Sequence, residues 1–285
     1  MPSRTLPGGE RLRTSWGSAT DRGLVRAVNE DALLAYPPVF LVADGMGGHD
    51  AGDVASRLAV EEFAQLAGRP HATSDDVHTC FTRTAERIRE TLDGRPCGTT
   101  VAGVAVAEHE GSSYWLVFNV GDSRVYRWLD GDLRQISVDH SVVQEMLDNG
   151  EIDEGQARTH PERHVLTRAL GSGAGPEPDY WMIPAGPHDR LLVCSDGLTG
   201  ELSDAVIAGV LGELADPQDA AQELVRLAVE AGGHDNVSTV VVDVATAHEG
   251  DTHMTVPRAG AGLDVSAWDE MLDGATVPRA RTREI

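Results

Sequence analysis

The stretch that decides the fold is VFLVADGMGGH, residues 39–49, in which five apolar residues run directly into Asp44-Gly45. A short unbroken apolar run that ends in a turn pair is typical of a strand buried on both faces. Functional side chains collect where such strands end. We therefore expect a buried strand over residues 39–43, with Asp44 at its end.

Three more apolar runs have an aspartate at one end. Residues 116–120 precede Gly121-Asp122, residues 191–195 precede Asp196-Gly197, and residues 237–244 begin just after Asp235-Asn236. An isolated Asp-Gly pair is more often a turn than a catalytic element, because aspartate bonds its own backbone and glycine accepts a positive φ. Here the pairs recur at the ends of buried strands, which places four aspartates at strand edges.

Carboxylates that converge at strand ends repel one another unless a cation neutralises them, and this is the physical reason to infer a metal. Hard oxygen ligands without a histidine or cysteine cluster favour magnesium or manganese over zinc. Two such ions that share a water can lower its pKa and aim it at phosphorus. Hydrolysis of a phosphoester is compatible with this pattern, although spacing by itself does not prove it.

The composition is that of a globular protein. The chain has 285 residues, of which 41% are hydrophobic, and a formal net charge of -23. Because duplex binding needs a basic surface, this charge argues against nucleic acid as a partner.

Cys80, Cys97 and Cys194 are too few and too scattered for a disulfide framework, which favours a reducing cytosol. No apolar stretch approaches the ~20 residues that span a bilayer, and the N-terminus lacks a secretion signal. We expect a cytoplasmic monomer with no membrane partner.

The chain is expected to form one domain over residues 12–247, with an N-terminal extension over 1–11 and a mobile tail over 248–285. Apolar residues at helical spacing predict helices over residues 51–66 and 75–92. A third helix is expected to begin at Asp216-Pro217 and to stop at Gly232-Gly233. Within the tail, Trp268, Met271 and Leu272 also fall at helical spacing.

Seven motifs together resemble a known family: RAVNED (26–31), DGMGGH (44–49), GTT (98–100), VGDSR (120–124), LTRALG (166–171), SDG (195–197) and DN (235–236). They occur in the order seen in the type-2C (PPM) metal-dependent serine/threonine protein phosphatases, and the resemblance is to the compact bacterial members. It covers nearly everything from Thr14 to Val244. The resemblance implies an α+β fold, a four-layer α/β/β/α sandwich with two central antiparallel sheets and a dinuclear metal centre in the cleft between them.

The resemblance also assigns metal ligands. Asp44 is expected to bridge two Mn²⁺ or Mg²⁺ ions, with the Gly45 carbonyl as a further ligand. Asp196 and Asp235 complete the shell of one ion, and Asp31, assisted by Glu30, serves the other. Two asparagines, Asn29 and Asn236, are expected to support these ligands. By resemblance, Asp122 holds a third, weaker ion together with Asp196; the structural alternative is a tight turn in which Asp122 caps backbone amides.

The phosphate clamp and the general acid are the two catalytic assignments. By resemblance Arg26 is the candidate clamp, because the family pattern places an arginine at this offset and a planar guanidinium offers two parallel donors to phosphoryl oxygens. The alternative is a surface ion pair with Glu30 or Asp31. Many eukaryotic members of the family carry a histidine where Met46 stands, and the resemblance implies that this histidine protonates the leaving alkoxide. The thioether of Met46 donates no proton. We assign the acid to His49, with His160, His164 or a metal-bound water as substitutes. Arg124 and Arg168 are interpreted as structural.

The resemblance implies hydrolysis of phosphoserine and phosphothreonine in proteins by a metal-bridged water. The expected partners are phosphorylated proteins, including a serine/threonine kinase or its targets. Residues 142–164 resemble a flap beside the cleft and are expected to govern substrate choice. Two alternatives stay open: a catalytically silent signalling module on the same fold, and a metal-dependent phosphatase that acts on small phosphoesters.

Overall fold

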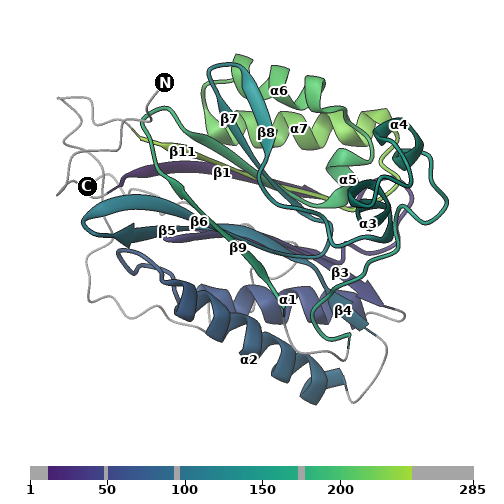
Figure 1. The fold of residues 1–285 in the computed structure, drawn as a ribbon, viewed down its shortest axis with the longest axis horizontal. Coiled ribbons are helices and arrows are strands. Elements are labelled where there is room, and N and C mark those ends of the chain that lie inside the picture. The colour runs from purple at the N-terminus through teal and green to yellow at the C-terminus, as the bar shows by residue number, and fades with distance from the viewer. Residues whose placement is uncertain (1–11, 48–50, 93–96, 173–176, 246–285) are drawn as a thin grey trace, which may run out of the picture.

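Two antiparallel sheets lie face to face at the centre of the molecule, between two layers of helices (Figure 1). The computed structural model describes residues 12–47, 51–92, 97–172 and 177–245. The predicted extension over residues 1–11 and the predicted tail, with its Trp268 helix, lie outside the described residues. No helix of the described chain is both long and apolar enough to cross a bilayer.

Each sheet is built from antiparallel neighbours. The first has the order β1 (Thr14–Asp21), β11 (Val237–Val244), β10 (Arg190–Cys194), β7 (Arg124–Leu129) and β8 (Asp132–Gln135). The second has the order β2 (Asp31–Tyr36), β3 (Val39–Gly47), β5 (Val101–His109), β6 (Ser112–Val120) and β9 (Asp179–Pro184), with β4 (Cys97–Thr99) paired to β3.

Helices cover the outer face of each sheet (Figure 1). The first sheet carries α6 (Asp204–Glu213) and α7 (Pro217–Ala231), and the second carries α1 (Ala51–Ala64) and α2 (Ser74–Leu92). Three short helices, α3 (Val142–Asp148), α4 (Glu154–Ala157) and α5 (Asp196–Thr199), lie together at one end of the molecule, on the right of Figure 1. The predicted four-layer sandwich is confirmed.

Three apolar clusters explain why the central strands read as unbroken apolar runs. In β3, Leu41 points into the cluster under α1 and α2, while Phe40 and Val42 point into the cluster between the sheets. In β10, Val193 faces the cluster between the sheets and Leu192 faces the cluster under α6 and α7. Because both faces of these strands are buried, the usual alternation of polar and apolar residues is absent, as predicted from the sequence.

The ends of α7 follow the predicted chemistry. The Asp216 carboxylate accepts hydrogen bonds from the backbone amides of Gln218 and Asp219, at 2.7 and 3.4 Å, and Pro217 stands at the first helical position. The helix ends before Gly232, where the sequence predicted a stop. These local signals fix the direction in which the chain enters β11 and therefore the position of Asp235.

Candidate active site

The candidate aspartates come from the ends of strands in both sheets. Asp31 and Asp44 stand directly opposite each other in the antiparallel pair β2–β3 of the second sheet. Asp196 follows β10 and Asp235 precedes β11, and these two strands pair within the first sheet. Asp122 follows β6. Strand pairing therefore places Asp31 beside Asp44 in one sheet, and Asp196 and Asp235 at the ends of two paired strands in the other.

Electrostatic coupling shows that these side chains share one region. Burial is the main cause that raises the pKa of Asp44 well above its ordinary value, and the negative charges of Asp31, Asp196, Asp122 and Asp235 raise it further. Each neighbouring carboxylate disfavours a second negative charge. Asp44 is thus surrounded by four further carboxylates whose charges raise its pKa, an arrangement that cations would stabilise.

Asp31 is the most enclosed member of this group, with 7% of its surface exposed. Its Oδ2 accepts a hydrogen bond of 2.8 Å from the Ser195 hydroxyl, whereas its Oδ1 is buried without any hydrogen-bond partner. Burial raises the pKa of Asp31 to about 7; hydrogen bonds from Ser238 and Ser195 oppose this shift, and the charges of Asp196 and Asp235 add to it. A buried oxygen without a partner is costly, and a bound cation would satisfy it.

Asp122 remains open to both of its interpretations. Burial raises its pKa to about 8, with further contributions from the charges of Asp196 and Asp139. The influence of Asp196 agrees with a shared ion. Asp122 also lies in the turn between β6 and β7, where a hydrogen bond from its own backbone amide lowers the same pKa.

Arg26 reaches this group from the solvent side. Its Nη2 lies 2.6 Å from Oδ2 of Asp235, and about half of the Arg26 side chain is exposed. This hydrogen bond is the largest cause that raises the Arg26 pKa, and the charges of Asp44 and Glu30 contribute less. The ion pair found is with a candidate metal ligand, not with Glu30 or Asp31 as the alternative interpretation supposed. Arg26 therefore lies where an anion bound to cations at these carboxylates would meet it.

Glu30, Asn29 and Asn236 tie the two sheets together around the site. The Glu30 amide donates to Oδ1 of Asn236 at 2.8 Å, and the Asp31 amide donates to Oδ1 of Asn29 at 3.2 Å. The Glu30 carbonyl accepts from the Gly45 amide at 3.1 Å and from the Ser56 hydroxyl at 2.6 Å. Both asparagines therefore bond the backbone at Glu30 and Asp31, and their support of metal ligands stays a prediction.

Gly45 is required for packing. A β-carbon at this position would lie 2.2 Å from the carbonyl oxygen of Gly52 in α1 and 2.6 Å from that of Glu30. Only glycine fits at such a distance. The family resemblance named only the Gly45 carbonyl, as a metal ligand, and the structure shows in addition that the space beside the α-carbon is filled by α1.

Of the histidines proposed as the general acid, His164 is the one that the structure places beside a candidate ligand. Its Nδ1 lies 3.7 Å from Oδ2 of Asp196, and the interaction with that carboxylate raises the pKa of His164. His160 instead accepts from the Glu162 amide at 3.2 Å. His49 lies outside the described residues, so its assignment stays a prediction.

Sequence reasoning missed the hydroxyl groups that support the aspartates. Ser195 donates to Asp31 and accepts from the Ser238 amide at 2.9 Å. The Thr100 hydroxyl accepts from the Asp44 amide at 3.0 Å. The signal available in the sequence was a serine or threonine at the end of an otherwise apolar run, such as Ser195. The structure shows that these hydroxyl residues are buried. Arg124, by contrast, holds Asp139 through bonds of 2.7 to 3.1 Å, which fits its structural interpretation.

The chemistry of the donors fits divalent cations. Within the described ranges, no three histidine, cysteine, aspartate or glutamate side chains are gathered closely enough to hold a metal ion. The carboxylates share a region without forming a closed shell, as expected for like charges that repel one another. The set is nevertheless all oxygen, includes the partnerless Oδ1 of Asp31 and comes from rigid strand ends. Hard oxygen donors of this kind are suited to Mg²⁺ or Mn²⁺.

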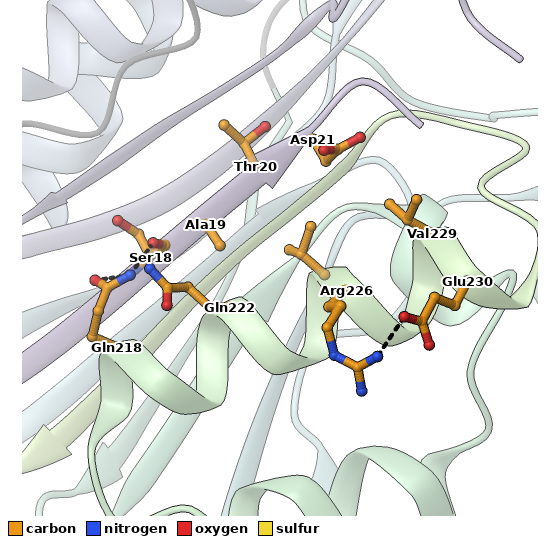
Figure 2. A pocket seen from close by; sticks show the side chains of 10 residues that line it. Ser18, Ala19, Thr20, Asp21, Gln218, Gln222, Arg226, Val229 and Glu230 are labelled. Carbon is orange, nitrogen blue, oxygen red and sulfur yellow. Dashed lines mark hydrogen bonds and ion pairs between the residues drawn. The ribbon is translucent and has the colours of Figure 1, made fainter. Parts of the chain in front are cut away.

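A separate cavity of about 580 Å³ lies between β1 and α7 (Figure 2). Its lining includes Arg226, which is ion-paired with Glu230, and none of the candidate ligands. Gln218 donates to the Ser18 carbonyl at 2.8 Å and accepts from the Ser18 amide at 3.1 Å. Because this side chain bonds the free edge of β1, it blocks pairing with another strand there.

Comparison with known proteins identifies the family. The family model for protein phosphatase 2C matches residues 25–230. The serine/threonine protein phosphatase PstP of Mycobacterium tuberculosis is 38% identical over 255 residues, which cover 87% of this chain and 48% of PstP. The serine/threonine phosphatase stp of Listeria monocytogenes is 34% identical over 239 residues, 79% of this chain and 93% of stp.

Solved structures agree with this result. The catalytic domain of PstP, in complex with two manganese ions, superposes with a TM-score of 0.72 at 34% identity, covering 82% of this chain and 99% of that one. The chain belongs to the protein phosphatase 2C family. It spans about half the length of the M. tuberculosis PstP that it matches.

Proposed function

We propose that this protein hydrolyses phosphoserine and phosphothreonine in phosphorylated proteins, with two manganese or magnesium ions held by the aspartates. The observation that carries the proposal is the convergence of Asp31, Asp44, Asp196 and Asp235 from both sheets, with Arg26 on the solvent side. The relatives named as serine/threonine phosphatases and the two manganese ions bound to PstP support it.

Asp44 and Asp31 would hold ions from one sheet, and Asp196 and Asp235 from the other, while Asp122 and Asp196 are the proposed ligands of a third, weaker ion. When bound, the ions would supply an activated water and neutralise charge on the phosphoryl group. The residues of the chain fix the geometry around that reaction. Ser195 holds Oδ2 of Asp31, and the hydrogen bond from the Asp44 amide to Thr100 fixes the end of β3.

Arg26 is the proposed phosphate clamp. Its guanidinium is half exposed and is held at Asp235 by an ion pair of 2.6 Å. Bound cations would neutralise Asp235 and weaken this pair, so that the guanidinium donors could turn to the phosphoryl oxygens of a substrate. His49 is the proposed group that protonates the leaving alkoxide, with His160, His164 or a metal-bound water as the alternatives, and of the three histidines His160 and His164 lie among the described residues.

Substrates of this kind are the products of serine/threonine kinases, so we propose that the physiological partners include such a kinase or its targets. We also propose a cytoplasmic location and a monomer. The first is supported by Cys80, Cys97 and Cys194, which are all buried and form no disulfide with one another. Thiols in this state suit a reducing compartment.

The test is release of inorganic phosphate from a phosphothreonine peptide with and without Mn²⁺. We expect Mn²⁺-dependent turnover that Asp44→Asn lowers by more than about 100-fold, because even residues that only support metal ligands change activity by about 10–100-fold. Asp132→Asn, an exposed carboxylate in β8, is the matched control and should retain full activity. Wild-type turnover in Asp44→Asn, or a preference for metabolite phosphates over peptides, would refute the proposal.

A further inference from the structure

The loop between β1 and β2 exposes large apolar side chains beside the candidate active site. Leu24 is 68% exposed, Val25 64% and Val28 46%. They are three of the seven large hydrophobic residues that are exposed in the described part of the chain. Arg26, the candidate phosphate clamp, lies between them in the sequence. We call Leu24, Val25 and Val28 the apolar loop face.

The backbone under this face is held in place. The Leu24 amide donates to the Gly233 carbonyl at 2.8 Å, and the Asn236 side chain donates to the carbonyls of Arg22 and Val28 at 2.9 and 3.0 Å. The partners come from the turn that carries Asp235. Because the backbone is tied down in this way, the loop does not rearrange to bury its apolar side chains. Apolar side chains that are held exposed in this manner are typical of a surface that a partner covers.

The position of Arg26 shows which partner fits. Arg26 is held against Asp235, and the Val28 carbonyl is bonded to Asn236 of the same turn, so an anion that binds Arg26 would lie where this loop is anchored. An extended peptide advances about 3.3 Å per residue, so residues next to a phosphorylated side chain at Arg26 would reach the apolar loop face. The carboxylates around the site would repel acidic neighbours, whereas apolar neighbours would be buried favourably.

We propose that the apolar loop face binds the segment of a phosphoprotein next to its phosphoserine or phosphothreonine and selects apolar side chains there. This inference rests on the proposed function and specifies its substrates. The occupant is a substrate segment, and the face acts on affinity for the peptide. It plays no part in breaking the phosphoester bond, so a small substrate without flanking residues would not report on it.

The experiment compares two phosphothreonine peptides of equal length and net charge, one with leucine or valine on both sides of the phosphothreonine and one with serine. With Mn²⁺, we expect kcat/KM of the wild type to be about tenfold higher for the apolar peptide, mainly through KM, the ratio that a small apolar contact provides. In Leu24→Ser/Val25→Ser the two values should agree within about twofold, while turnover of p-nitrophenyl phosphate stays unchanged.

Val206→Ser/Met182→Ser is the matched control, because both residues are exposed and apolar and lie in α6 and β9. It should keep the wild-type preference. The inference is overturned if the wild type hydrolyses both peptides equally well, or if the preference survives in Leu24→Ser/Val25→Ser. It is also overturned if light scattering shows that the wild type is a dimer and that Leu24→Ser/Val25→Ser is a monomer, because the apolar loop face is then covered by a second copy of the chain. If neither peptide nor p-nitrophenyl phosphate is hydrolysed, the proposed function itself fails, and the inference with it.

Discussion

At the scale of single residues, burial and mutual repulsion raise the pKa of Asp31 to about 7 and that of Asp122 to about 8. In an unfolded chain an aspartate titrates near pH ~4. At pH values between about 4 and about 8, these two aspartates bind more protons in the folded state than in the unfolded state. The free energy of unfolding therefore falls as pH rises through this range. The stability that Asp31 and Asp122 contribute is complete below about pH 4 and is lost as pH passes through about 7 to 8.

We therefore expect metal-free wild-type protein to lose stability relative to Asp31→Asn between pH 5 and pH 8, by on the order of 2 kcal/mol. Urea unfolding in the presence of EDTA measures the difference, with the exposed Asp132→Asn as a control that should show no such trend. A difference between wild type and Asp31→Asn that does not change with pH would contradict the assigned burial of this charge.

The single residues also show where sequence reasoning ends. An aspartate at either end of an apolar run can be read from the sequence, and Asp44, Asp196 and Asp235 were predicted in this way. The bond from Ser195 to Asp31 joins residues 164 positions apart, and the ion pair of Arg26 with Asp235 joins residues 209 apart. Such pairings depend on how the sheets stack, so the true partner of Arg26 was not predicted.

At the scale of elements, the packing of β3 against α1 depends on Gly45. Gly45→Ala places a β-carbon 2.2 Å from the Gly52 carbonyl, so β3 or α1 must shift. We expect the free energy of unfolding to drop by about 1–3 kcal/mol. Gly209→Ala in α6, where a β-carbon meets nothing within 4 Å, should instead raise it by about 0.5–1 kcal/mol. Chemical denaturation of both variants tests this, and equal stabilities would argue against the packing account.

The segment over residues 142–164 is tied at its base and projects from the sheets. The Val142 amide donates to the Val165 carbonyl at 2.9 Å, and Thr167 donates to the His140 carbonyl at 2.9 Å. His164 brings its end to Asp196. We expect exchange of residues 142–164 for those of a relative to change peptide preference while turnover of p-nitrophenyl phosphate changes little. Unaltered preferences among a panel of phosphopeptides would count against a role in substrate choice.

The elements differ in how well the sequence predicts them. The central strands β3, β10 and β11 were predicted because both of their faces are buried. The edge strand β1 mixes polar and apolar residues, and its polar Ser18 is explained only by Gln218, which lies 200 positions away. A short-range pattern does not contain this contact.

At the scale of the whole molecule, the candidate site joins the two halves of the sandwich. Asp31 and Asp44 belong to the second sheet, and Asp196 and Asp235 adjoin strands of the first. The family resemblance predicted this layered architecture, and the structure confirms it. What the resemblance could not supply is the apolar loop face beside Arg26, which depends on the exposure and anchoring of particular side chains.

The most direct test of the account is a calorimetric titration of metal-free protein with Mn²⁺. Aspartates drawn from both sheets predict two ions bound per chain, and Asp44→Asn, which removes the shared ligand, should lose most of this binding while Asp132→Asn keeps it. Absence of Mn²⁺ binding by the wild type, or the same stoichiometry and affinity in Asp44→Asn, would contradict the claim that cations hold these carboxylates together.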